Sequence, residues 1–321
     1  MKYRKENIVD GILNSEIRFL SKAITLIESA STKHFELGQD ILEEVLQNSG
    51  NSIRIGITGP PGVGKSTLIE ALGLHYCNEN YKTAVLAIDP SSKVSGGSIL
   101  GDKTRMLQLS KHENSYIRPT PSSGMLGGTS ARTKESIQLC EAAGFQRILV
   151  ETVGVGQNEI NISDLVDVLI ILLNPGSGDE LQGIKRGVLE VSDIIAINKA
   201  DINIKLVNET VLEYKNAIRL IDYDKDFWKR KVLKISALES IGIEKVTNTI
   251  DSFIKQSKDI GFFDKNRINQ EKERLLEVLK LEILKRKLNN QEFKNSYNAI
   301  VNQIENNETT AIKGAMKLLD E

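Results

Sequence analysis

The sequence is poor in several features that mark secreted, membrane-bound or nucleic-acid-binding proteins. Its 321 residues include two cysteines, Cys77 and Cys140, whose wide separation gives no disulfide framework. Lys and Arg number 42 and Asp and Glu 43, so the formal net charge of -1 offers no electrostatic basis for binding nucleic acid or an anionic membrane. The longest apolar run, 166–173, is strand-sized and contains Asp167, and no apolar signal core lies near the N-terminus. We therefore expect a soluble protein of a reducing compartment, the cytoplasm, without nucleic-acid or membrane partners.

One glycine-rich stretch organises the chain. Residues 59–67 have the sequence G-P-P-G-V-G-K-S-T, which matches the G-x-x-x-x-G-K-[ST] pattern of phosphate-binding loops. A β-branched run, 53–58, precedes it and an apolar helical segment, 68–76, follows. In such a loop, backbone N–H groups surround a polyphosphate, the Lys reaches the β- and γ-phosphates, and the next hydroxyl ligates Mg²⁺. We expect nucleotide contacts from Gly59, Pro61, Gly62, Val63, Gly64, Lys65, Ser66 and Thr67, with Lys65 also catalytic and Ser66 also on the metal.

Short apolar runs alternate with longer helical patterns from Ser52 to Ser236. The expected strands are 52–58, 83–89, 147–152, 167–174, 193–199 and 231–236, and the expected helices between them are 66–79, 132–143, 179–190 and 205–221. Several strand patterns are almost continuously apolar, as in parallel strands that are covered on both faces. This order predicts an α/β fold of the P-loop NTPase type, with a doubly wound, mostly parallel sheet and the ligand at the carboxyl ends of the strands.

A second motif indicates which base is bound. Residues 198–201, Asn-Lys-Ala-Asp, end a predicted strand, and the Asp201 carboxylate can accept hydrogen bonds from guanine N1–H and the exocyclic amine. Adenine offers neither donor, so it would leave a buried carboxylate unpaired. Asn198 is expected to brace the loop, and the Lys199 stem to lie on the base. Ser236, Ala237 and Leu238 fit the companion loop whose backbone N–H meets the guanine oxygen, so we predict GTP rather than ATP.

Acidic residues follow predicted strands near the phosphate loop. Glu151 ends the strand 147–152 and is expected to hold the magnesium shell, with Asp89 and Asp102 as further metal-side candidates. Val155 stands where many GTPases place a glutamine that orients water, so we expect slow intrinsic hydrolysis that depends on another group. Lys185 is the candidate for neutralising charge on the transferred phosphoryl group.

Helical patterns flank this region on both sides. Residues 8–48 predict two helices, and a linker over 261–268 precedes three predicted helices that run to Leu319. We therefore expect an N-terminal helical extension over 1–50, a P-loop GTPase domain over 51–258 and a C-terminal helical arm over 259–321. The arm carries an apolar stripe, for which a dimer partner is favoured over packing on its own sheet domain.

Together these motifs resemble one family, the methylmalonyl-CoA mutase-associated GTPases of the MeaB (ArgK) type. The resemblance covers roughly residues 15–255 and includes, besides the phosphate loop and Asn198–Asp201, the stretches Ala23–Ser29, Asp89–Ser92, Ser95–Met106, Glu151–Gln157 and Gly178–Lys185.

The resemblance implies a homodimeric GTPase that binds GTP, GDP and Mg²⁺ and acts as a chaperone of an adenosylcobalamin-dependent acyl-CoA mutase. It would gate cofactor loading and protect or reactivate the mutase. It further implies that Asp89, Asp102 and Glu151 lie on the metal side and that Arg105, Asp179 and Lys185 act in a partner-responsive switch. The sequence has no D-x-H-x-x-G cobalamin motif, so the cofactor is expected to stay with the partner.

Three alternatives remain open. A nickel metallochaperone GTPase would need a Cys/His cluster, whereas His34, His75 and His112 are isolated and the cysteines lack ligand spacing. A transport-linked ATPase or kinase would not need Asp201. A nucleotide-gated binding module with incidental turnover would differ from a chaperone GTPase in not being accelerated by the mutase.

Overall fold

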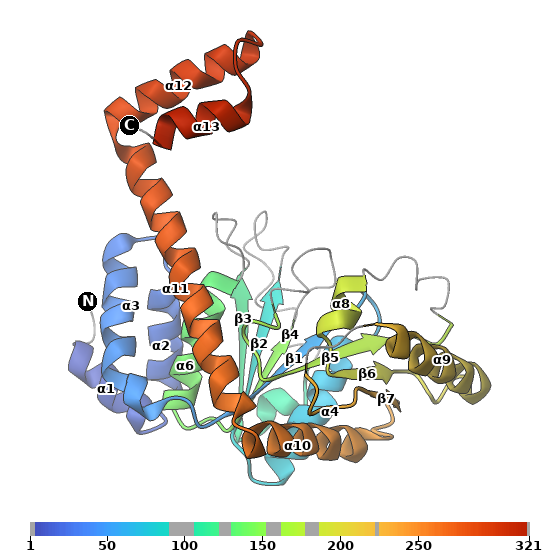
Figure 1. Ribbon diagram of the computed structural model, residues 1–321. Coiled ribbons are helices and arrows are strands. Elements are labelled where there is room, and N and C mark those ends of the chain that lie inside the picture. Colours follow the sequence, from blue (N-terminus) through green and yellow to red (C-terminus); the bar gives the residue numbers. More distant parts are fainter. Residues whose placement is uncertain are drawn as a thin grey trace. The chain divides into compact units, whose positions relative to one another are not determined.

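The computed structural model describes residues 4–89, 106–121, 130–151, 162–176, 186–221 and 225–319. Its centre is a seven-stranded sheet in the order β3-β2-β4-β1-β5-β6-β7, in which every neighbouring pair is parallel (Figure 1). The strands are β1 (Ile53–Thr58), β2 (Thr83–Asp89), β3 (Ser115–Pro121), β4 (Arg147–Glu151), β5 (Val168–Leu173), β6 (Ile194–Ile197) and β7 (Lys231–Lys234). The predicted α/β fold with a parallel sheet is confirmed, and each predicted strand is present.

β3 is a strand that the sequence analysis did not predict. It contains Pro119 and Pro121, which cannot donate a backbone hydrogen bond and therefore argue against a central strand. Among the residues that the structure describes, β3 pairs with β2 and forms one edge of the sheet, where one side of the strand needs no partner. Its edge position explains why the prolines are tolerated.

Helices cover both faces of the sheet. The elements of one face are α1 (Lys5–Leu13), α2 (Ile17–Ile27), α3 (Thr32–Val45), α6 (Ser130–Ala142), α8 (Arg186–Val191) and α9 (Ile204–Ala217). On this face Ile24 and Ile41 share one buried apolar cluster with Ile148 of β4. On the other face, α4 (Lys65–Asn78) and α10 (Ile243–Asp259) bury apolar residues against β1 and β5. The sheet is thus doubly wound, as predicted.

The N-terminal region forms three helices, so the prediction of two was wrong. Ser15 lies between α1 and α2 with a φ of +61°, and its hydroxyl donates to the carbonyl oxygen of Ala143 at 2.9 Å. Gly11 allows the two helices to pack closely, because a Cβ there would lie 2.0 Å from the Phe19 ring. This break between α1 and α2 has no proline or glycine to mark it in the sequence.

The chain divides into two compact units, 1–267 and 268–321. The predicted linker over 261–268 is wrong, because the helix α11 (Phe262–Asn289) begins directly after Gly261 and continues into the second unit. In that unit α12 (Gln291–Glu305) packs on α13 (Ala311–Leu319), where Gly314 lies against Ile300. Among the described residues, no helix combines the length and the apolar character that crossing a bilayer requires.

Candidate nucleotide site

The phosphate loop connects β1 to α4 at the carboxyl edge of the sheet. Gly59 and Gly64 have φ angles of +144° and +98°, which L-residues with a side chain rarely adopt. A Cβ on Gly59 would lie 2.2 Å from the carbonyl oxygen of Leu172 in β5, and one on Gly64 would lie 2.5 Å from Asn198 Nδ2. The glycines therefore let the loop turn tightly between two neighbouring segments before the helix begins, and α4 points the positive end of its dipole at this loop.

Lys65 places its ammonium group inside the loop. Its side chain is 9% exposed, and Nζ donates to the carbonyl oxygens of Gly59 at 2.8 Å and Pro60 at 3.0 Å. A buried ammonium group held by loop carbonyls lies where a β- or γ-phosphate of a bound nucleotide would interact with it. The role of the Pro60 carbonyl was not predicted, because the sequence motif specifies side chains and not which carbonyls the lysine contacts.

Two side chains with oxygen atoms that can ligate a metal ion meet beside the loop. Ser66 Oγ donates to Glu151 Oε1 at 3.0 Å, and Glu151, at the end of β4, is 9% exposed. β4 pairs with β1, which brings the carboxylate to the phosphate loop. A hydroxyl and a carboxylate are hard oxygen donors of the kind that Mg²⁺ prefers, so the residues fit this ion.

The structure describes only part of the predicted metal and catalytic set. The backbone of Asp89 ends β2, two residues beyond Ala87, which pairs with Glu151. The side chain of Asp89 lies outside the described residues, as do Asp102, Arg105, Asp179 and Lys185. Among the described residues, no three or more His, Cys, Asp or Glu side chains form a cluster that could hold a metal ion.

Asn198 joins the phosphate loop to the predicted base-binding loops. It is 3% exposed; Nδ2 donates to the carbonyl oxygen of Val63 at 2.8 Å, and Oδ1 accepts from the backbone N–H of Ala237 at 2.9 Å. Lys199 has a φ of +59°, and its Nζ donates to the carbonyl oxygen of Gly62 at 3.2 Å. The structure thus brings the two sequence motifs, which are more than 130 residues apart, into direct contact.

The companion loop lies directly beside Asn198. Ala200 N–H donates to the carbonyl oxygen of Ile235, and Ser236 pairs with Ile241, so residues 236–241 turn back next to residues 198–201. Ser236 is fully buried, whereas Leu238 is 74% exposed. Asp201 follows Asn198 by three residues and is exposed.

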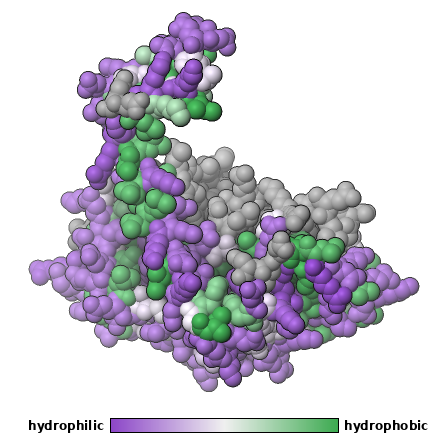
Figure 2. All heavy atoms as spheres, in the orientation of Figure 1, coloured by the Kyte–Doolittle hydropathy of each residue, from purple (hydrophilic) through white to green (hydrophobic). Residues whose placement is uncertain are grey.

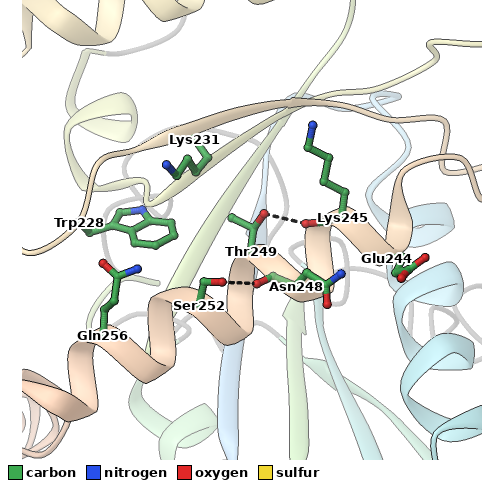
Figure 3. Close-up of a pocket in the computed structure, with 8 residues that line it drawn as sticks. All are labelled: Trp228, Lys231, Glu244, Lys245, Asn248, Thr249, Ser252 and Gln256. Atoms are coloured by element: carbon green, nitrogen blue, oxygen red, sulfur yellow. Dashed lines mark hydrogen bonds between the residues drawn. The ribbon is translucent and has the colours of Figure 1, made fainter.

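A separate open pocket of about 470 Å³ lies on another surface, between α10 and the start of β7 (Figure 3). It is lined by α10 from Glu244 to Gln256 and by Trp228 and Lys231. Its Thr249 and Ser252 hydroxyls donate to carbonyl oxygens of their own helix. None of the predicted nucleotide-binding residues lines this pocket.

Comparisons with known proteins give consistent matches over most of the chain. A family profile described as methylmalonyl Co-A mutase-associated GTPase MeaB matches residues 20–292. GTPase ArgK of Escherichia coli is 41% identical over 303 residues, which cover 93% of this chain and 91% of that protein. The mitochondrial methylmalonic aciduria type A homolog of Mus musculus is 42% identical over 278 residues, 83% of this chain and 67% of that protein. A crystal structure titled LAO/AO transport system kinase has a TM-score of 0.79 and 33% identity, and covers 98% of this chain and 96% of that one.

Proposed function

This chain belongs to the MeaB family of methylmalonyl-CoA mutase-associated P-loop GTPases, and we propose that it is the GTP-hydrolysing chaperone of an adenosylcobalamin-dependent acyl-CoA mutase. The partner would be methylmalonyl-CoA mutase or a related enzyme, which it would meet in the cytoplasm. GTP hydrolysis would gate the loading of the cofactor and protect or reactivate the mutase.

One observation carries the nucleotide assignment. Asn198 contacts Val63 of the phosphate loop and Ala237 of the companion loop. Asp201 lies three residues after Asn198 in the same loop, which follows β6. A single rigid side chain therefore sets the spacing between the groups proposed for the phosphates and those proposed for the base. This arrangement supports a guanine nucleotide whose phosphates and base are bound at one edge of the sheet.

The chemistry would be the transfer of the γ-phosphoryl group of GTP to water, giving GDP and phosphate. Backbone N–H groups of the loop and Lys65 would bind the phosphates and offset the negative charge that develops in the transition state. Ser66 and Glu151 would hold Mg²⁺, which supplies further positive charge at the β- and γ-phosphates. We propose Arg105, Asp179 and Lys185 as the residues that complete this machinery when the partner binds.

The C-terminal arm is proposed to mediate a homodimer. Figure 2 shows hydrophobic side chains along α11, and among them Leu275, Leu279 and Ile283 are 70%, 51% and 53% exposed. These residues are spaced four apart, so they share one face of the helix. Contiguous exposed apolar surface of this kind marks a protein interface.

Two measurements test the proposal. GTP hydrolysis by the purified protein is expected to be slow alone and to accelerate when a purified adenosylcobalamin-dependent mutase is added. ATP is expected to compete poorly with labelled GTP, which also separates a GTPase from a transport-linked kinase. Equal binding of both nucleotides would refute the base assignment, and unchanged hydrolysis in the presence of the mutase would refute the chaperone role.

A further inference from the structure

We propose that Thr210, in α9, is a positioning residue that couples the base-binding loop to the chain segment that leaves β5 beside the phosphate loop. The inference rests on the guanine site proposed above. It concerns a residue that no sequence motif marks, in contact with a segment more than 30 residues earlier in the chain.

A hydrogen bond ties the end of β5 to α9. The backbone N–H of Gly176 donates to Thr210 Oγ1 at 3.0 Å, and the Thr210 hydroxyl donates its own proton to the carbonyl oxygen of Leu206 at 2.9 Å. Thr210 is 1% exposed, whereas Gly176 is exposed, so the bond joins a buried side chain to an exposed segment of backbone. Leu206 also lies under Gly176, because a Cβ on that glycine would be 3.3 Å from Leu206 Cδ2. Two neighbouring turns of α9 therefore fix the backbone at Gly176, whose φ is +77°.

Gly176 follows the strand that borders the phosphate loop. It follows the end of β5 by three residues, and β5 pairs with β1 up to Thr58, directly before the phosphate loop. Leu172 of β5 lies against Gly59 of that loop. The chain held by Thr210 therefore leaves the sheet from the strand beside the phosphate loop. The next residues, 177–185, lie outside the described part.

The other end of the connection is the base-binding loop. Asn203 is the N-cap residue of α9, and its side chain accepts a hydrogen bond from the backbone N–H of Leu206 at 3.1 Å. Asp201 precedes this cap by two residues. A base that binds Asp201 would restrain the cap and the first turn of α9, which carries Leu206, and the next turn carries Thr210. Base binding should therefore slow the opening of the bond between Gly176 and Thr210.

A threonine that bonds the carbonyl four residues earlier is common in helices and needs no coupling role. Thr249 in α10 provides this comparison, because its Oγ1 donates to the carbonyl oxygen of Lys245 at 2.6 Å (Figure 3). The Thr249→Val variant loses the same local bond as Thr210→Val but keeps the contact with Gly176. Thr210→Ser retains the hydroxyl and should rescue the coupling.

The test is hydrogen exchange at the Gly176 amide, followed by mass spectrometry of overlapping peptides, with and without GDP and Mg²⁺. We expect GDP to slow exchange in the wild-type protein, in Thr249→Val and in Thr210→Ser. In Thr210→Val, exchange with GDP present should be roughly threefold to tenfold faster, as expected for loss of one hydrogen bond. The Kd for GDP should rise by about the factor by which GDP protects the Gly176 amide in the wild type, because the coupling between two sites is reciprocal.

Two outcomes would overturn the coupling alone: equal GDP protection in Thr210→Val and wild type, or GDP binding to the wild type without any protection at Gly176. If GDP failed to bind the wild-type protein, both the guanine site and the coupling would be refuted. The chaperone role is decided separately, by mutase-stimulated phosphate release from the wild type.

Discussion

The side chain of Asn198 donates a hydrogen bond to the carbonyl oxygen of Val63, and it accepts another from Ala237. Both bonds are buried, so the loops that meet a nucleotide at opposite ends share one connecting residue. This relationship predicts that the two ends of the site cannot be perturbed independently.

Replacing Asn198 with Ala should weaken GDP binding and destabilise the fold. The substitution leaves the carbonyl oxygen of Val63 and the N–H of Ala237 without these partners, at a cost of about 2–4 kcal/mol for two buried bonds. Calorimetry of GDP binding and thermal unfolding would measure both effects. Asn248→Ala, at an exposed position of α10, is the control and should change neither. Wild-type affinity in Asn198→Ala would show that the connection is dispensable.

Magnesium dependence should separate the roles of Ser66 and Glu151. Ser66→Ala removes a proposed metal ligand and should raise the Mg²⁺ concentration required for half-maximal GTP hydrolysis by about tenfold or more. Glu151→Gln keeps the shape of the side chain and a neutral oxygen acceptor, so we expect it to raise the required Mg²⁺ concentration as well, but by a smaller factor. Titration of Mg²⁺ at saturating GTP is the measurement, with Ser136→Ala as the control in α6. An unaltered Mg²⁺ requirement in both variants would remove these residues from the metal site.

A buried charge network near the start of β1, at the end of the strand away from the phosphate loop, should make the free energy of unfolding depend on pH. Glu141 accepts hydrogen bonds from Arg54 at 2.8 and 2.9 Å and from Ser52 at 2.5 Å, and Arg267 lies 3.7 Å away. Burial by itself would raise the pKa of the Glu141 carboxyl, but these hydrogen bonds and the two guanidinium groups hold it below its ordinary value of 4.5. Because the folded-state pKa is lowered, the network stabilises the fold above the unfolded-state pKa, and this contribution is lost as the pH falls through the folded-state pKa.

Glu141→Gln should therefore lower the free energy of unfolding at neutral pH by about 3–5 kcal/mol, since it removes the carboxylate charge that pairs with the buried Arg54 guanidinium. The difference from wild type should shrink as the pH falls below about 4.5, the ordinary pKa that the carboxyl has in the unfolded chain, and toward the lower pKa of the folded-state carboxyl. Urea unfolding between pH 3.5 and pH 7, at roughly half-unit steps, would test this dependence. Glu213→Gln, at an exposed position of α9, is the control. A difference that stays constant across this range would contradict the assignment of the stabilising charge to Glu141.

The exposed apolar face of α11 should be the dimer contact. Leu279→Glu places a charge in that face and is expected to convert the homodimer to a monomer at micromolar concentration, as measured by light scattering after size exclusion. Lys280→Glu introduces the same side chain at the neighbouring exposed position and should leave the dimer intact. A wild-type monomer, or a dimer that survives Leu279→Glu unchanged, would exclude this face.

The sequence predicts the sheet and both nucleotide motifs because they depend on local patterns. Continuous apolar runs such as that in β5 identify strands buried on both faces, and residues 59–67 carry their own conformational requirements in glycine and lysine. β3 escaped prediction because its prolines are compatible with a strand only at an edge, and the edge is a property of the whole sheet.

Contacts between distant segments could not be predicted from local patterns. Arg267 donates to both carboxylate oxygens of Asp167, 100 residues earlier, at 2.7 and 2.6 Å, and Thr210 reaches Gly176 across 34 residues. Neither pair has a motif or a regular spacing in the sequence. The expected linker at 261–268 was wrong for a related reason. Phe263, in the first turn of α11, is buried in the apolar core of the sheet domain, and a stretch that begins with glycine and contains several polar residues does not indicate this burial.

The most direct test of the account is the base preference of Asp201→Asn. The carboxylate of Asp201 is proposed to accept from N1–H and the exocyclic amine of guanine, whereas an amide can donate to the second carbonyl oxygen of xanthine. Calorimetry should show that the wild-type protein binds GDP and not ADP, and that Asp201→Asn loses about two orders of magnitude or more in GDP affinity while gaining affinity for XDP. Equal binding of ADP and GDP by the wild type, or an unchanged preference for GDP in Asp201→Asn, would contradict the guanine site on which the proposed function depends.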